Sequence, residues 1–223
     1  PAQPGKWRLG GALGLLGMPG VVAVVWALLP TLKVNETLLP LPLEAVLLLS
    51  GLQTAVLLAL AVALGVWLAP RVGLRAPAVS SWVAGQPAGP ALRAQLVPGL
   101  CGGVVGAAWL WLLSRLAPAA LQPSDPANAM PLAVKLLYGG ITEELLMRWG
   151  VMTLLLWLGW RLLQRGQGRP GKRLVAAAVL LSAVLFAVGH LPAAQALAGV
   201  LTVPVVAFVL AGNTVFGLVA GWL

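Results

Sequence analysis

Long apolar stretches follow one another along nearly the whole chain, and this pattern limits what it can fold into. Of the 223 residues, 60% are hydrophobic and only 9% are charged, whereas a soluble domain carries about 25% charged residues. A helix that crosses the roughly 30 Å hydrocarbon core of a bilayer needs about 20 apolar residues. We therefore predict an all-α, polytopic transmembrane helix bundle with about six to eight spanning helices, surrounded by the lipid bilayer.

The apolar stretches also predict where the spanning helices lie. Prolines and polar or basic loops separate them, because such residues end a membrane helix. The expected helices cover residues 9–29, 44–69, 91–116, 132–163, 174–190 and 193–210, and residues 213–223 begin another. Pro30, Pro70 and Pro192 mark three helix ends, Pro204 interrupts the helix over 193–210, and residues 118–131 form a polar loop.

The basic residues cluster between the apolar stretches. They lie before the first helix, around the loop over residues 71–93, and in the loop over residues 161–173. If every helix crosses the membrane, these three regions share one side, which the positive-inside rule predicts to be cytoplasmic. The formal net charge of +9 is thus explained without a nucleic-acid partner. We expect a multi-pass protein of the cell membrane, in a prokaryotic inner membrane.

Four ionisable residues interrupt the apolar pattern at membrane depth. Glu143, Glu144 and Arg148 lie in the helix over 132–163, and His190, the only histidine, lies in the next helix. A charge at the centre of a membrane costs about 2.5–3.5 kcal/mol on insertion scales, so such residues indicate a functional site. At 1.5 Å per residue, Glu144 and His190 both lie roughly 25 Å from the basic end. An antiparallel helix pair would bring them to the same height.

Helix geometry separates the roles of these residues. Glu144 and Arg148 are four residues apart and are predicted to form an ion pair. Glu143 is turned about 100° away, which leaves its carboxylate free for proton transfer. A glutamate and a histidine that meet at one water molecule suit general-base catalysis of peptide hydrolysis. Three glycines near the face of Glu143 predict an open groove beside it: Gly139, Gly140 and Gly150.

The residues alone leave three explanations open. The cluster could hydrolyse peptides, serve a transporter or proton relay, or form a buried salt bridge that only fixes helix packing. With one histidine and one cysteine, a metal site would need mostly carboxylate ligands, so we expect neither a metal nor an organic cofactor. Cys101 is predicted to be a small buried core residue.

Two motifs carry a family resemblance. The sequence YGGITEELLMRWG from Tyr138 to Gly150 resembles the EExxxR motif of the CPBP family, the CAAX protease and bacteriocin-processing (Abi) proteins, and FAVGH from Phe186 to His190 resembles its FxxxH motif. The resemblance implies an intramembrane glutamic peptidase in which Glu143 is the base and His190 assists it. Glu144 and Arg148 would support the site. Its partner would be a peptide or membrane-protein substrate.

The third motif of the family contains a histidine, usually followed by an asparagine four residues later, and the sequence holds no second histidine. Residues 215–223 resemble the stretch that leads into this motif, so we expect the motif beyond Leu223.

We therefore expect one membrane domain over residues 1–223. It comprises two N-terminal helices and a loop over 1–90, and a CPBP-like core over 91–223 that continues past the given end. The expected function is an intramembrane endopeptidase that uses a glutamate-activated water to hydrolyse peptide bonds of membrane-associated substrates. The alternatives are a non-enzymatic membrane binding or immunity protein and a proton-coupled transporter that uses the same polar cluster.

Overall fold

The computed structural model describes residues 5–34, 36–122 and 130–222, and the regular structure of this part of the chain is entirely helical. Five segments in it are long and apolar enough to cross a membrane. They are α1 (Lys6–Val34), α2 (Leu43–Val72), α4 (Gly89–Ser114), the pair α7 (Lys172–Gly189) and α8 (Leu191–Ala198), and α9 (Val203–Trp222). The shorter elements are α3 (Pro77–Val83) and the 3-10 turns Glu36–Leu38 and Ala119–Leu121. The predicted all-α membrane bundle is confirmed.

A further long helix covers residues 132–163 and is wound more loosely in its middle. It consists of α5 (Leu132–Val134), the π-helical segments Lys135–Thr142 and Leu145–Met152, and α6 (Thr153–Leu163), and we call it the motif helix. In a π-helical turn a backbone N–H bonds to the carbonyl five residues earlier, as the N–H of Glu143 does to Tyr138. Our prediction of a uniform α-helix over these residues is therefore wrong. π-helical turns are rare and occur frequently at functional sites.

Two buried threonines accompany the loose winding. The Thr153 hydroxyl donates to the carbonyl of Arg148, five residues earlier, at 3.2 Å. The Thr142 hydroxyl lies 3.2 Å from the carbonyl five residues before it and 2.7 Å from the carbonyl of Gly17 on α1. It has one proton to donate, and the shorter contact is its hydrogen bond. Thr142 therefore joins the motif helix to α1.

Glycines allow α1 and α2 to approach the motif helix closely. A Cβ atom on Gly20 of α1 would overlap the Thr142 hydroxyl, and one on Gly65 of α2 would overlap the indole of Trp149. A Cβ on Gly150 would lie 2.9 Å from the Cα of Ala61 on α2. Gly150 is thus a packing contact and does not line a groove, which corrects the prediction for that residue.

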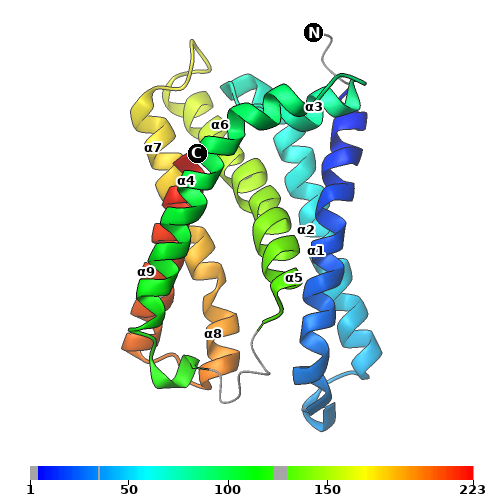
Figure 1. The fold of residues 1–223 in the computed structure, drawn as a ribbon, viewed down its shortest axis with the longest axis vertical. Helices are drawn as coiled ribbons and strands as arrows, with labels where there is room; N and C mark the ends of the chain where they lie inside the picture. The colour runs from blue at the N-terminus through cyan, green and yellow to red at the C-terminus, as the bar shows by residue number, and fades with distance from the viewer. Residues whose placement is uncertain (1–4, 35, 123–129, 223) are drawn as a thin grey trace.

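The motif helix lies between two groups of helices. Figure 1 shows α1 and α2 along one side of it and α4, α7 and α9 along the other, with α4 crossing in front of α9. Helix α9 packs on α7 through Gly217, where a Cβ would lie 2.9 Å from the Cβ of Ala183. Small residues of this kind let membrane helices pack closely without a hydrophobic driving force. The central helix is therefore held from both sides.

The prolines do not end the helices where we predicted. Helix α1 continues through Pro30 to Val34, and α2 continues through Pro70 to Val72. A proline removes only one backbone donor, and membrane helices tolerate this near their ends. Pro192 lies in the first turn of α8 and so begins a short helix after α7.

The predicted boundaries over residues 193–223 are also wrong. Helix α8 stops at Ala198, and Gly199 reverses the chain with a φ of 74°. Pro204 lies in the first turn of α9, where its fixed φ favours helix formation. Residues 213–223 are therefore not a separate helix, because α9 runs unbroken from Val203 to Trp222.

The three basic regions gather at one end of the molecule. Figure 1 shows the start of α1, helix α3 and the α6–α7 loop at the same end, as the charge pattern predicted. Most of the predicted polar loop over 118–131 lies outside the described residues, which exclude positions 123–129. Cys101 is exposed on α4, so the prediction of a buried residue is wrong.

Candidate active site

The structure brings Glu143 and His190 together between the motif helix and the end of α7. Glu143 Oε1 lies 3.8 Å from His190 Nε2, and their side chains are 18% and 34% exposed. This distance is too long for a direct hydrogen bond. A water molecule about 2.8 Å from both atoms would bridge them. The predicted meeting of these residues from neighbouring helices is present in the structure.

The imidazole of His190 is oriented by Phe186, one turn earlier on α7. His190 Nδ1 lies 2.8 Å from the Phe186 carbonyl oxygen. A carbonyl only accepts hydrogen bonds, so Nδ1 carries the proton, and in the neutral ring Nε2 presents its lone pair towards Glu143. The two rings also pack edge to face, with centroids 4.5 Å apart. Both contacts hold the histidine in one rotamer.

Arg148 joins three helices beside this pair. Its Nη1 lies 3.3 Å from Glu144 Oε1, the predicted ion pair. Its Nη2 donates to the Gly217 carbonyl of α9 at 3.3 Å, and its Cζ lies 5.1 Å from the ring centroid of Phe186 on α7, within the range of a cation–π contact. The arginine side chain is 12% exposed and that of Glu144 is 34% exposed. Arg148 therefore connects the motif helix, α7 and α9 around the site.

The glycines predicted to open the site fall into two groups. A Cβ on Gly139 would lie 3.7 Å from Glu143 Oε2, and one on Gly140 would meet only a carbonyl of its own segment, at 3.8 Å. These two positions leave space next to the carboxylate, whereas Ala61 of α2 occupies the space beside Gly150. The part of the helix on the α5 side of Glu143 is thus the more open part.

The sequence did not predict two features of this site. One is the Gly217 carbonyl as a partner of Arg148, although the pair Gly217 and Gly221 marks α9 as a packing face. The other is the pair of π-helical segments on either side of Glu143 and Glu144. Within the described residues, no group of three or more His, Cys, Asp or Glu side chains could hold a metal ion.

The arrangement suits proton transfer. It combines a carboxylate and an imidazole that face each other across the width of one water molecule, next to a separately neutralised Glu144. Among the described residues, Glu143 has no partner within hydrogen-bonding distance, and such a carboxylate can accept a proton from bound water. These groups are partly exposed and can therefore be reached from outside the bundle.

Comparison with protein families matches residues 125–223 to a family described as "Rce1-like: Type II CAAX prenyl endopeptidase Rce1-like". Comparisons with curated proteins and with solved structures gave no match. The matched segment contains the motif helix, α7, α8 and α9, and so includes all four site residues. Residues 125–223 of this chain are thus similar to the Rce1-like type II CAAX prenyl endopeptidases.

Proposed function

We propose that the protein is an intramembrane endopeptidase in which Glu143, assisted by His190, activates a water molecule that hydrolyses a peptide bond. The observation that supports this most strongly is the 3.8 Å approach of Glu143 Oε1 to His190 Nε2. The family match at residues 125–223 supports the reaction class, because its description names endopeptidases. The substrate is a membrane-associated peptide or protein.

The two acceptor atoms orient the water. Glu143 Oε1 and His190 Nε2 each accept one of its protons, so that a lone pair of the water oxygen is left for the carbonyl carbon of the substrate. The hydrogen bond from Nδ1 to the Phe186 carbonyl, at 2.8 Å, favours the tautomer in which Nε2 is an acceptor. Such positioning of a reactant is a large part of catalysis.

The proton balance of the reaction is closed by Glu143. Its carboxylate takes a proton as the water oxygen bonds to the carbonyl carbon, and a tetrahedral intermediate forms. The protonated carboxyl then delivers this proton to the amide nitrogen as the C–N bond breaks. The products are a new carboxyl terminus and a new amino terminus, and Glu143 returns to its carboxylate form.

Glu144 and Arg148 have supporting roles in this proposal. Arg148 neutralises Glu144 at 3.3 Å, so the site retains one carboxylate for proton transfer. Through Phe186, 5.1 Å from its guanidinium, it also supports the ring that packs on His190. Removal of Arg148 would therefore affect both sides of the pair.

Cleavage by reconstituted protein tests the proposal. Glu143→Gln keeps the shape of the side chain but removes its basicity, and His190→Ala removes the second acceptor. We expect each to lower the cleavage rate by about 10²–10⁴-fold, the contribution typical of general acid–base catalysis. Glu44→Gln, at the exposed start of α2, is the matched control and should keep the wild-type rate. Full activity of Glu143→Gln would refute the proposed role of Glu143.

A chelator distinguishes the glutamate mechanism from a metal mechanism. We propose that neither a metal nor an organic cofactor takes part, so incubation with EDTA should leave the rate unchanged. A loss of activity that added metal restores would contradict this part of the proposal. Prenylated CAAX peptides are the first substrates to test, with the unprenylated peptides beside them, because the family description names CAAX prenyl endopeptidases.

We also propose that the protein lies in the inner membrane of a prokaryotic cell, with the basic end in the cytoplasm. The concentration of Lys and Arg in the loops at one end supports this orientation.

A further inference from the structure

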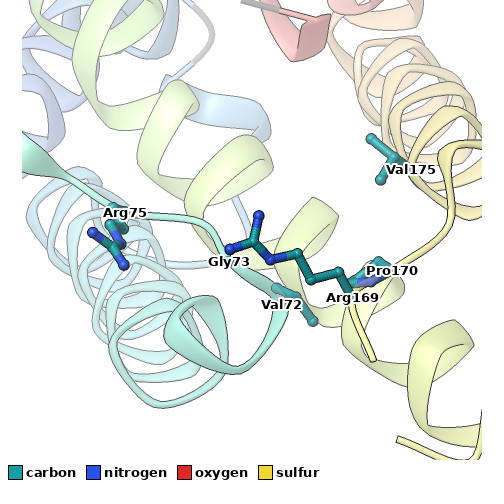
Figure 2. Close-up of a pocket in the computed structure, with 6 residues that line it drawn as sticks. All are labelled: Val72, Gly73, Arg75, Arg169, Pro170 and Val175. Atoms are coloured by element: carbon teal, nitrogen blue, oxygen red, sulfur yellow. The ribbon is translucent and has the colours of Figure 1, made fainter. Parts of the chain in front are cut away.

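A cavity of about 360 Å³ lies at the basic end of the molecule, away from Glu143 and His190. It opens between the end of α2 and the loop that leads into α7, so it joins the N-terminal helices to the segment matched by the family. Figure 2 shows Arg169 extending from its loop towards Gly73, and the Arg75 side chain beyond Gly73. The lining residues are Val72, Gly73, Arg75, Arg169, Pro170 and Val175.

The charge of this cavity has no counterpart within the described residues. The acidic residues described are Glu36 and Glu44, which lie in the connection and helix start at the opposite end, and the two glutamates of the motif helix. The Glu144–Arg148 ion pair and the Glu143–His190 contact, which are the contacts between acidic and basic side chains formed by described residues, both belong to the candidate active site. Arg75 and Arg169 therefore have no carboxylate within 4 Å in this part of the chain, and an anion from outside would neutralise them.

A well-defined helix end presents Arg75. The N–H groups of Gly73 and Leu74 both bond to the Ala69 carbonyl, and Gly73 has a φ of 83°. The bond from Leu74 is the 6→1 bond of the Schellman motif, in which a left-handed glycine ends the helix. Leu74 packs into the core cluster that contains Val72. The path of the chain to Arg75 is therefore fixed before any ligand binds.

An equally ordered loop presents Arg169. The Trp160 indole N–H lies 3.3 Å from the Gln167 carbonyl and 3.2 Å from the Gly168 carbonyl. The backbone N–H of Gly171 donates to the Gln164 side chain at 3.3 Å. These bonds hold the loop before and after Arg169, so the two guanidinium groups are presented by ordered turns of separate elements.

The floor of the cavity is apolar and belongs to the core. Val72 is buried and Val175 packs against the same cluster, which also contains Met152, Leu156 and Val179 of the motif helix and α7. Arginines above an apolar floor, at the ends of membrane-spanning helices, lie at the height of lipid headgroups. A ligand with an anionic group next to an apolar part matches these surroundings.

We propose that this cavity binds the phosphate group of an anionic phospholipid headgroup. Arginine forms bidentate, charge-assisted hydrogen bonds with phosphate, and basic pockets between membrane helices are suited to such lipids. The cavity volume is that of a small-ligand site. A bound headgroup links Arg75 after α2 to Arg169 before α7, and so stabilises the contact between the N-terminal helices and the helix that carries His190.

Thermal unfolding in micelles tests this proposal. The probes are phosphatidylglycerol, phosphatidylcholine at the same mole fraction, and inorganic phosphate at the same phosphate concentration. Phosphatidylglycerol should raise the Tm of the wild type by at least about 2–4 °C, because a ligand that binds only the folded state stabilises it. Phosphatidylcholine and inorganic phosphate should give a much smaller shift.

Two double variants separate the cavity from the overall charge. Arg75→Ala with Arg169→Ala should abolish the shift, and native mass spectrometry should show at least a tenfold weaker retention of phosphatidylglycerol. Arg93→Ala with Arg173→Ala removes the same charge at the same end, outside the cavity, and should keep the shift. All four arginines are exposed, so both variants should unfold near the wild-type temperature without lipid.

Two results would overturn the proposal. An equal response of both double variants to phosphatidylglycerol would mean that general surface charge attracts the lipid. An equal response of the wild type to inorganic phosphate would mean that the cavity takes free phosphate and not a lipid headgroup. Neither result depends on peptidase activity.

Discussion

Arg148 is the residue that connects the separate parts of the site. It contacts Glu144, the Gly217 carbonyl and the Phe186 ring at once. Its Nη1 is fully buried and, among the described residues, has the 3.3 Å contact with Glu144 but no aligned hydrogen bond. A planar guanidinium with donors on several sides can serve three partners, whereas the single ammonium of a lysine cannot.

Arg148→Lys should therefore destabilise the protein although the charge is kept. Breaking a fully buried ion pair costs about 3–5 kcal/mol. This pair is partly exposed, so the lysine variant should lose only a fraction of that amount, because it cannot maintain all three contacts. Differential scanning fluorimetry in detergent would measure the Tm. Arg161→Lys, exposed near the end of the same helix, is the control and should leave the Tm unchanged. Equal Tm values for both variants would show that Arg148 does not have this linking role.

Phe186 orients His190 through its ring as well as through its carbonyl. Phe186→Leu keeps the backbone carbonyl but removes the edge-to-face contact at 4.5 Å, so the imidazole should sample other rotamers. We expect kcat to fall about tenfold with little change in KM, since the substrate does not need the ring for binding. Leu185→Val, on the exposed face of α7, is the control. A change confined to KM would contradict an orienting role.

At the scale of residues, the sequence predicted the contacts that depend on spacing along one helix. Glu144 and Arg148 are four apart, and this alone predicts their ion pair. The approach of Glu143 to His190 could be expected from counting residues to the basic ends of two adjacent helices. The Gly217 carbonyl could not be predicted, because it depends on how α9 packs against the motif helix.

The motif helix shows why the length of a helix could be predicted better than its type, α-helical or π-helical. Its apolar length predicted a long helix over 132–163, and this helix is present. Apolar length does not distinguish α-helical from π-helical turns, and the hydrogen bond from Thr153 to the carbonyl five residues earlier carries no signal in the hydropathy pattern. The prolines were misread for a similar reason, because their effect depends on whether they lie in the first turn, as Pro204 does, or inside a helix.

Close packing of α1 on the motif helix leads to a test with an internal control. Gly20→Ala adds a methyl group where the Thr142 hydroxyl and the Leu137 carbonyl already lie, so the helices must move apart. Overpacking of this kind costs about 1–3 kcal/mol. Gly14→Ala lies on the same helix, with nothing within 4 Å of the added Cβ, and should be neutral or stabilising.

Thermal unfolding of the two glycine variants would measure the difference. A lower Tm for Gly20→Ala than for Gly14→Ala would support the close approach of α1 to the motif helix. Equal Tm values would mean that α1 packs elsewhere. In that case the hydrogen bond between Thr142 and Gly17 would also be absent.

At the scale of the whole molecule, the charge pattern predicted one basic end, and the structure places the three basic regions there (Figure 1). The orientation of this end in the membrane can be measured by cysteine labelling. In a Cys101→Ser background, Gln167→Cys probes the α6–α7 loop and Thr37→Cys probes the opposite end. Both positions are exposed.

A membrane-impermeant maleimide applied to intact cells should label Thr37→Cys and leave Gln167→Cys unlabelled until the membrane is opened. This is expected because basic loops stay in the cytoplasm. Labelling of Gln167→Cys from outside would reverse the proposed orientation. It would leave the helix packing unaffected.

The proposed site depends on the motif helix and the end of α7 meeting around one pair of side chains, Glu143 and His190. A double-mutant cycle measures directly whether this pair acts as a unit. Single-turnover cleavage rates are compared for the wild type, Glu143→Gln, His190→Ala and the double variant. Thermal unfolding first checks that each of these proteins is folded. If both residues position one water, the double variant should lose no more than the more damaging single variant. If the two losses multiply, Glu143 and His190 act independently, and the shared water is contradicted.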